Sequence, residues 1–216
     1  MEFIREVNET SMRLTFALMS ILFCFWSWMI INVPSLFNLS TVYLFLLSGA
    51  SIIGGLAYAS NFTYPFATLG FPTVRELPKT TLIGAIVGAA WIYIGAVFSI
   101  AFATPFQTSI YETLPFIVAL IFAVAISLTE EIMMRATILP TVARILDNKT
   151  AAIIFTSIFF AALHWAVYQS QPAALVSAFL FSIVVSMLTL HYRTGWVAGA
   201  AHTTYNLIIL YLMLQP

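Results

Sequence analysis

Seven long apolar runs limit this chain to a helical membrane fold. Crossing the hydrocarbon core of a bilayer takes about 20 mainly apolar residues in a helix. The chain has runs near this length at about 14–33, 41–60, 82–103, 114–135, 151–168, 173–191 and 196–214. Only 7% of its 216 residues are charged, whereas soluble domains carry about 25%. The sequence therefore predicts an all-α, polytopic transmembrane bundle of about seven spans.

Most connections between these runs are too short to hold a separate domain, so we expect one integrated membrane domain. Residues 1–110 would supply three N-terminal spans and residues 111–216 the last four. Two stretches are not simple spans. Residues 61–80 contain three prolines and are predicted to form a loop. Residues 136–149 follow the fourth span, and Pro140 is expected to kink or end the helix there, before an amphipathic, interfacial segment.

The basic residues predict the orientation of the chain, because lysine and arginine concentrate in cytoplasmic loops. With seven spans, all eight of them fall on one side. We therefore expect the N-terminus in the cytoplasm and the C-terminus outside. The formal net charge is zero, so no nucleic-acid partner is expected, and the single cysteine, Cys24, excludes a disulfide framework.

Pairs of glycines at four-residue spacing mark two of the predicted spans. Gly84 and Gly88 lie in the third, and Gly195 and Gly199 flank the start of the seventh. Such spacing lets helices approach closely. Packing within the bundle is the favoured interpretation, with a dimer interface as the alternative.

The fourth run carries three charges, Glu130, Glu131 and Arg135. A charge near the bilayer centre costs about 2.5–3.5 kcal/mol on insertion scales, so it normally faces a cavity or a partner. Residues four apart lie on one helix face, whereas neighbours diverge by about 100°. Arg135 is therefore expected to pair with Glu131, leaving Glu130 directed elsewhere as a candidate general base. The alternative is a solvated helix end at the interface.

Three further polar side chains occur in later spans. His164 lies inside the fifth, and His202 and Asn206 lie one turn apart in the seventh. At about 1.5 Å per residue, Glu130 would lie about 15 Å from the cytoplasmic end of its span, His164 about 21 Å and His202 about 11 Å. His164 is the outlier, and a shared layer requires tilted helices.

Carboxylate and imidazole groups can hold and deprotonate a water, while a second imidazole and an amide can donate to an oxyanion. This set suits amide hydrolysis. The alternative is a zinc site formed by Glu130, His164 and His202 with a water at the fourth position. Ser127 lies one turn before Glu131 and is interpreted as helix packing.

Three motifs in this order resemble those of the CPBP family of intramembrane proteases: "EEIMMR" at 130–135, "FAALH" at 160–164 and "HTTYN" at 202–206. That family includes the CAAX prenyl endopeptidases and bacterial Abi and bacteriocin-processing proteins. The resemblance covers about residues 115–210 and implies that 111–216 are a catalytic core. Residues 1–110 are matched only as membrane helices. Ala136 departs from the glycine that often follows the first motif.

The resemblance also implies a role for each motif residue. Glu130 would activate water together with His164, His202 and Asn206 would stabilise the oxyanion, and Glu131 and Arg135 would support them. Phe160 would line the substrate cavity. His191 belongs to none of the motifs, and an interfacial position is expected for it.

The predicted activity is therefore endopeptidase cleavage of a membrane-associated peptide or prenylated protein within the lipid bilayer. No cofactor is expected, with zinc as the alternative. A non-catalytic scaffold or bacteriocin-immunity protein is a second hypothesis. A proton- or ion-coupled transporter is a third, against which the chain shows no pair of broken helices in matching halves.

Overall fold

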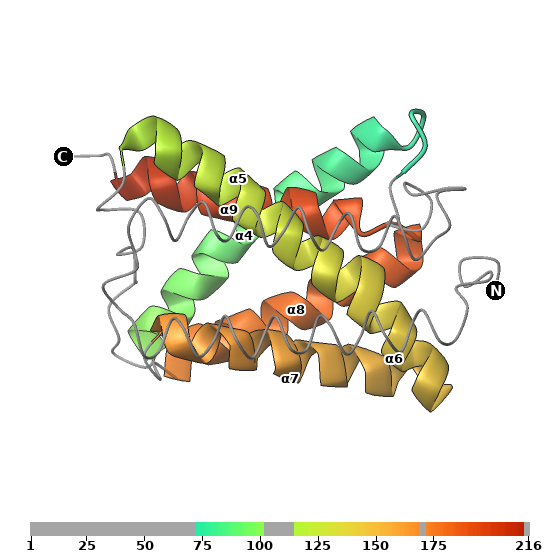
Figure 1. The fold of residues 1–216 in the computed structure, drawn as a ribbon. Helices are drawn as coiled ribbons and strands as arrows, with labels where there is room; N and C mark the ends of the chain where they lie inside the picture. Colours follow the sequence, from blue (N-terminus) through green and yellow to red (C-terminus); the bar gives the residue numbers. More distant parts are fainter. Residues whose placement is uncertain (1–71, 102–114, 169–171, 214–216) are drawn as a thin grey trace.

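The computed structural model describes residues 72–101, 115–168 and 172–213, which form helices joined by short turns (Figure 1). There is no strand among these residues, in agreement with the all-α prediction. The predicted spans at 14–33 and 41–60 lie outside the described residues, as does most of the predicted loop at 61–80. The count of seven spans and the orientation of the termini therefore stay predictions.

The described helices match the last five predicted spans in order. They are α4 (Leu77–Ala101), α5 (Phe116–Glu131), the π-helix η3 (Ile132–Ile138), α6 (Leu139–Leu146), α7 (Lys149–Tyr168), α8 (Pro172–Tyr192) and α9 (Trp196–Met213). Among them, Leu77–Val97 and Pro172–Tyr192 are long and apolar enough to cross a membrane.

Helix α4 begins inside the stretch predicted to be a loop, so that prediction is wrong for residues 77–80. Glu76 accepts hydrogen bonds from both the hydroxyl group (2.8 Å) and the backbone N–H of Thr73, as in a capping box. These bonds lower the pKa of the Glu76 carboxyl. Pro78 is tolerated because it lies in the first turn, where its missing N–H would have no partner within the helix.

The fourth predicted span continues as a helix well beyond Arg135. The segments α5, η3 and α6 follow one another without a break from Phe116 to Leu146, so Pro140 does not end the helix. Instead the turns before it widen, and the Leu139 N–H bonds to the Met134 carbonyl, five residues back. A π-helical segment of this kind often occurs at functional sites, and Arg135 lies within it.

Short turns connect the later helices. Asp147 adopts a left-handed conformation with φ 47°, and the Asn148 side chain accepts the Ala151 N–H at 3.0 Å to cap α7. After α8, Arg193 is left-handed with φ 55°, and the Thr194 N–H returns to the Thr189 carbonyl at 3.2 Å. These caps satisfy backbone groups that helix ends leave without intrahelical partners.

The glycines of α4 pack it closely against α9, as the bundle-packing interpretation predicted. A Cβ atom added at Gly84 would lie 2.5 Å from the Val197 carbonyl oxygen, and one added at Gly88 would overlap the Ala201 carbonyl oxygen. Gly199 similarly faces the side chain of Leu128. The Trp196 indole also donates to the Thr81 hydroxyl at 2.8 Å, which joins the beginnings of α9 and α4.

Helix α5 runs antiparallel to α9, and α6 meets the start of α7. In Figure 1, α5 begins beside the end of α9, and the α5–η3–α6 segment then crosses the bundle diagonally to the beginning of α7. This crossing brings the end of α5 between α9 and α7, the two helices that carry the predicted histidines. The core around it includes Met134, Phe160 and Phe181.

Candidate active site

Glu131 and Arg135 form a buried ion pair, as the helix-face argument predicted. Arg135 Nη1 lies 3.0 Å from Glu131 Oε2, and the side chains are 0% and 1% exposed, respectively. Arg135 Nη2 also donates to Ser182 Oγ of α8 at 2.9 Å, and its guanidinium lies 4.7 Å from the centre of the Phe160 ring. The solvated helix end that was the alternative is therefore wrong for Glu131 and Arg135.

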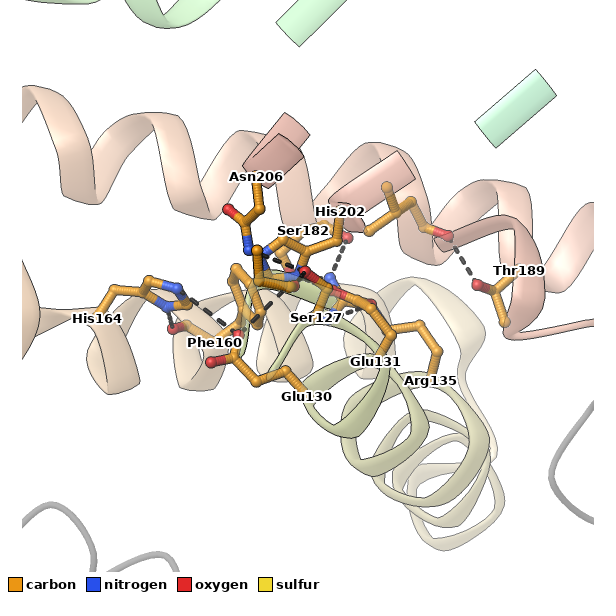
Figure 2. Close-up of polar contacts among 12 residues, drawn as sticks. Ser127, Glu130, Glu131, Arg135, Phe160, His164, Ser182, Thr189, His202 and Asn206 are labelled. Atoms are coloured by element: carbon orange, nitrogen blue, oxygen red, sulfur yellow. Dashed lines mark hydrogen bonds and ion pairs between the residues drawn. The ribbon is translucent and has the colours of Figure 1, made fainter. Parts of the chain in front are cut away.

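His202 hydrogen-bonds to the other oxygen of the same carboxylate. Its Nδ1 lies 2.9 Å from Glu131 Oε1. An ionised carboxylate only accepts hydrogen bonds, so Nδ1 carries the proton and donates it. Glu131 thus joins α9 to the arginine of η3, and the orientation of the His202 ring is fixed by this bond (Figure 2).

Glu130 lies between the two imidazoles, as Figure 2 shows. Its Oε2 is 3.8 Å from His164 Nε2 and 3.9 Å from His202 Nδ1. Both distances exceed a direct hydrogen bond, and this buried oxygen has no hydrogen-bond partner among the described residues. The Glu130 side chain is 18% exposed, in contrast to the enclosed Glu131. The two adjacent carboxylates therefore have different surroundings, as expected from their divergence on the helix.

His164 belongs to the same layer as Glu130, although the depth estimate from straight helices made it the outlier. The estimate fails because the α5–η3–α6 segment crosses α7 obliquely (Figure 1). His164 Nδ1 lies 2.8 Å from the Phe160 carbonyl oxygen. Because a carbonyl can only accept, Nδ1 carries the proton, and Nε2 in the neutral ring presents a lone pair toward Glu130.

Asn206 lies one turn beyond His202 and bonds back to α5. Its Nδ2 donates to Ser127 Oγ at 2.8 Å, while the Ser127 hydroxyl donates to the Ala123 carbonyl at 2.6 Å. Ser127 is buried, as its interpretation as a packing residue predicts, and it is also a hydrogen-bonding partner of the predicted site.

Phe160 is almost fully enclosed, with 2% of its surface exposed. Its ring centre lies 4.4 Å from that of His164 and 5.9 Å from that of His202, and the Arg135 guanidinium also lies over it. These contacts place Phe160 among the polar side chains. Contact with a substrate, the role expected from the resemblance, stays a prediction.

Two serines join the site without belonging to any motif. Ser182 of α8 and Ser127 of α5 each contact a motif residue through the hydroxyl group. The spacing of Ser127 to Glu131, four residues, was a signal that could have placed it on the same face. No comparable signal marked Ser182. His191 is exposed at the end of α8, its ring 4.7 Å from that of Tyr192, and it is not part of the cluster.

The zinc alternative stays a prediction, and it would require a change in the arrangement of its donors. Within the described part of the chain, no group of three His, Cys, Asp or Glu side chains is arranged to hold one metal ion. The His202 nitrogen that faces Glu130 is already hydrogen-bonded to Glu131 at 2.9 Å. A ligand set of Glu130, His164 and His202 would require that ring to be rearranged.

Comparison with known families identifies the region that carries this cluster. Residues 112–208 match the family model described as Type II CAAX prenyl endopeptidase Rce1-like. These residues form an Rce1-like region. The resemblance to CAAX-type CPBP proteases is thereby confirmed, and the match contains every residue of the cluster. No curated protein and no solved structure matches the chain.

The family that residues 112–208 match is one of membrane-embedded proteases. Together with the two apolar helices long enough to span a bilayer, it supports an integral membrane protein. Helix α4 and the residues before it lie outside the match.

Proposed function

We propose that the chain is an intramembrane endopeptidase of the CAAX type, which hydrolyses a peptide bond of a membrane-associated peptide or prenylated protein. The observation that carries this proposal is the position of Glu130. Its Oε2 has no hydrogen-bond partner among the described residues and faces His164 Nε2 at 3.8 Å. A water between these two atoms would supply the hydrogen-bond partner that Glu130 Oε2 lacks among the described residues.

In this mechanism Glu130 is the general base. It takes one proton from the water while His164 Nε2 accepts a hydrogen bond from the other O–H, and the oxygen of the water attacks the carbonyl carbon of the substrate. The carbonyl oxygen becomes an oxyanion. Glu130 then passes its proton to the leaving nitrogen, and the C–N bond breaks to give a carboxylic acid and an amine. Proton transfer from the acid to the amine leaves a carboxylate and an ammonium group as the products.

His202 and Asn206 stabilise the oxyanion in the proposed mechanism. Since His202 Nδ1–H is given to Glu131, its Nε2 donates only when the ring carries both protons. Two carboxylates would stabilise this imidazolium, because Nδ1 lies 2.9 Å from an oxygen of Glu131 and 3.9 Å from an oxygen of Glu130. Its charge together with that of Arg135 balances the charges of Glu130 and Glu131. Buried charges are tolerated when they are paired in this way.

Arg135, Ser182 and Phe160 support this arrangement. The Arg135 guanidinium is fixed by Glu131, by Ser182 and by the face of Phe160. It therefore holds Glu131 in the position that orients His202. We propose that no metal takes part; the hydrogen bond from His202 Nδ1 to Glu131 supports this, because it would have to break before Glu130, His164 and His202 could bind zinc.

The proposal is tested by cleavage of a fluorogenic farnesylated CAAX peptide by the purified full chain in lipid vesicles. Wild type, Glu130→Gln, Glu76→Gln and wild type with a zinc chelator are compared. The Glu76 carboxylate is the control because it is exposed at the start of α4. We expect wild type to be active with and without the chelator, and Glu76→Gln to be active as well. Glu130→Gln should lose activity.

Other results would contradict specific parts of the proposal. Loss of activity with the chelator would overturn the metal-free mechanism. Absence of wild-type cleavage of both this peptide and an unprenylated transmembrane peptide library would overturn the peptidase assignment and favour a non-catalytic scaffold.

A further inference from the structure

Two side-chain hydrogen bonds join α5 to α9, and only one of them links two motif residues. Glu131 bonds His202 at 2.9 Å, and one turn away Ser127 bonds Asn206 at 2.8 Å. The helices are antiparallel, so four residues back along α5 correspond to four residues forward along α9. One turn beyond Ser127, the contact continues with Ala123 and Leu210, both buried in the same apolar cluster. The interface is therefore apolar one turn beyond the Ser127–Asn206 hydrogen bond.

The single hydroxyl hydrogen of Ser127 is not available to Asn206. The hydrogen is donated to the Ala123 carbonyl at 2.6 Å, within the same helix. Toward Asn206 the hydroxyl oxygen can therefore only accept, and an amide meets an acceptor with its NH₂ group, not with its oxygen. Ser127 is fully buried, so water does not compete for this lone pair.

This bond determines which end of the Asn206 amide faces α5. Figure 2 shows Nδ2 turned toward Ser127 and the amide oxygen turned away from it. One Nδ2 hydrogen is donated to Ser127. Because the amide group is planar, this bond also fixes the direction of the second Nδ2 hydrogen. Without the hydroxyl group, a half-turn about the last side-chain bond would exchange the oxygen and the nitrogen at little cost in shape.

We propose that Ser127 is a positioning residue that fixes the Asn206 amide as a hydrogen-bond donor to the oxyanion. The inference rests on the proposed function. An amide rotated by half a turn would present its oxygen to the developing negative charge, which is repulsive. Preoriented donors of this kind typically contribute about 10²–10³-fold to kcat, and loss of the fixed orientation removes part of that factor.

The test is a double-mutant cycle with Ser127→Ala and Asn206→Ala in the full chain in lipid, using the peptide substrate above. Ser127→Ala is expected to lower kcat about tenfold with little change in KM. In the Asn206→Ala background the same substitution should have no further effect, because its action passes through the amide. Ser157→Ala is the matched control, since Ser157 is equally buried on α7 and its hydroxyl has no hydrogen-bond partner among the described residues.

A second measurement does not depend on turnover. In ¹⁵N-asparagine-labelled protein, the side-chain amide signals of Asn206 are identified by their loss in Asn206→Ala. One of its two protons should exchange slowly with solvent in wild type and in Ser157→Ala, and rapidly in Ser127→Ala. Unchanged exchange in Ser127→Ala would overturn the proposed hydrogen bond.

The outcomes separate this inference from the function on which it rests. An equal loss of kcat on Ser127→Ala with and without Asn206 would overturn the positioning role and leave the peptidase assignment intact. A wild-type protein without turnover would overturn both the assignment and the catalytic consequence of Ser127, whatever the exchange measurement shows.

Discussion

Glu131 and His202 are 71 residues apart in the sequence and are joined by a buried hydrogen bond of 2.9 Å. The other oxygen of the Glu131 carboxylate faces Arg135 at 3.0 Å. A single buried carboxylate thus connects α9, α5 and the π-helical turn that carries the arginine. Glu130, the residue before it, has a buried oxygen that lies between two imidazoles and has no hydrogen-bond partner among the described residues.

Removing the Arg135 charge is expected to destabilise the fold strongly, because it leaves Glu131 buried without its ion-pair partner. Arg135→Met should lower the free energy of unfolding by about 3–5 kcal/mol, whereas the double variant Glu131→Gln with Arg135→Met should recover part of this loss. Unfolding in detergent micelles by denaturant measures both. Arg193→Met at an exposed arginine is the control, and a comparable loss there would contradict the buried pair.

Ser182 is expected to contribute through its bond to the guanidinium. Ser182→Ala should lower the free energy of unfolding by about 1.5–3 kcal/mol, as for a hydrogen bond to a charged group. Ser186→Ala is the matched control one turn along α8, because Ser186 is equally buried and its hydroxyl has no hydrogen-bond partner among the described residues. Equal effects of the two substitutions, measured by the same unfolding transition, would show that the Ser182 hydroxyl has no special role.

Close packing of α4 on α9 makes Gly88 intolerant of a side chain. A Cβ atom at Gly88 would overlap the backbone of Ala201, next to His202. Gly88→Ala should therefore lower the free energy of unfolding by about 1–3 kcal/mol, as for other overpacked sites. Ala90→Leu on the exposed face of α4 should have little effect. Thermal unfolding of the two variants in lipid checks this, and an unaffected Gly88→Ala protein would rule out the close approach.

The capping bond at Glu76 predicts a weak pH dependence of stability. The Thr73 hydrogen bonds lower the pKa of the Glu76 carboxyl below its usual value of 4.5. Folding is therefore favoured by the ionised carboxylate above about that pH, and this contribution is lost as the pH falls through the lowered pKa. Between pH 6 and pH 3 the melting temperature of wild type should fall more than that of Glu76→Gln. Parallel curves for the two proteins would contradict the capping bond.

The part of the site that sequence could predict is the part fixed within one helix. The Glu131–Arg135 pair follows from a spacing of four residues, and the divergence of Glu130 follows from a spacing of one. Both agree with the structure. The packing of Gly84 and Gly88 was likewise visible, because small residues at this spacing leave room for only a few kinds of neighbour.

The remainder depends on how helices cross and on local backbone changes. Depth counted along straight, parallel helices makes His164 the outlier unless the helices tilt, and in the structure the helix with Glu130 crosses α7 obliquely. Pro140 was expected to end or kink the helix, but a π-helical segment widens the turn before it. Ser127 and Ser182 acquire their partners from the pairing of α5 with α9 and of η3 with α8, and neither pairing is encoded by a local motif.

The role of Glu130 as the general base is tested by the ratio of kcat for Glu130→Gln to that of wild type, measured on the same peptide in the same vesicles. Glutamine keeps the shape of the side chain but cannot take a proton. We expect kcat to fall by about 10²–10⁴-fold, the usual contribution of a general base, with an unchanged melting temperature and an unaffected Glu76→Gln control. A ratio near one in a folded, active protein would contradict the assignment of Glu130 as the base that activates water.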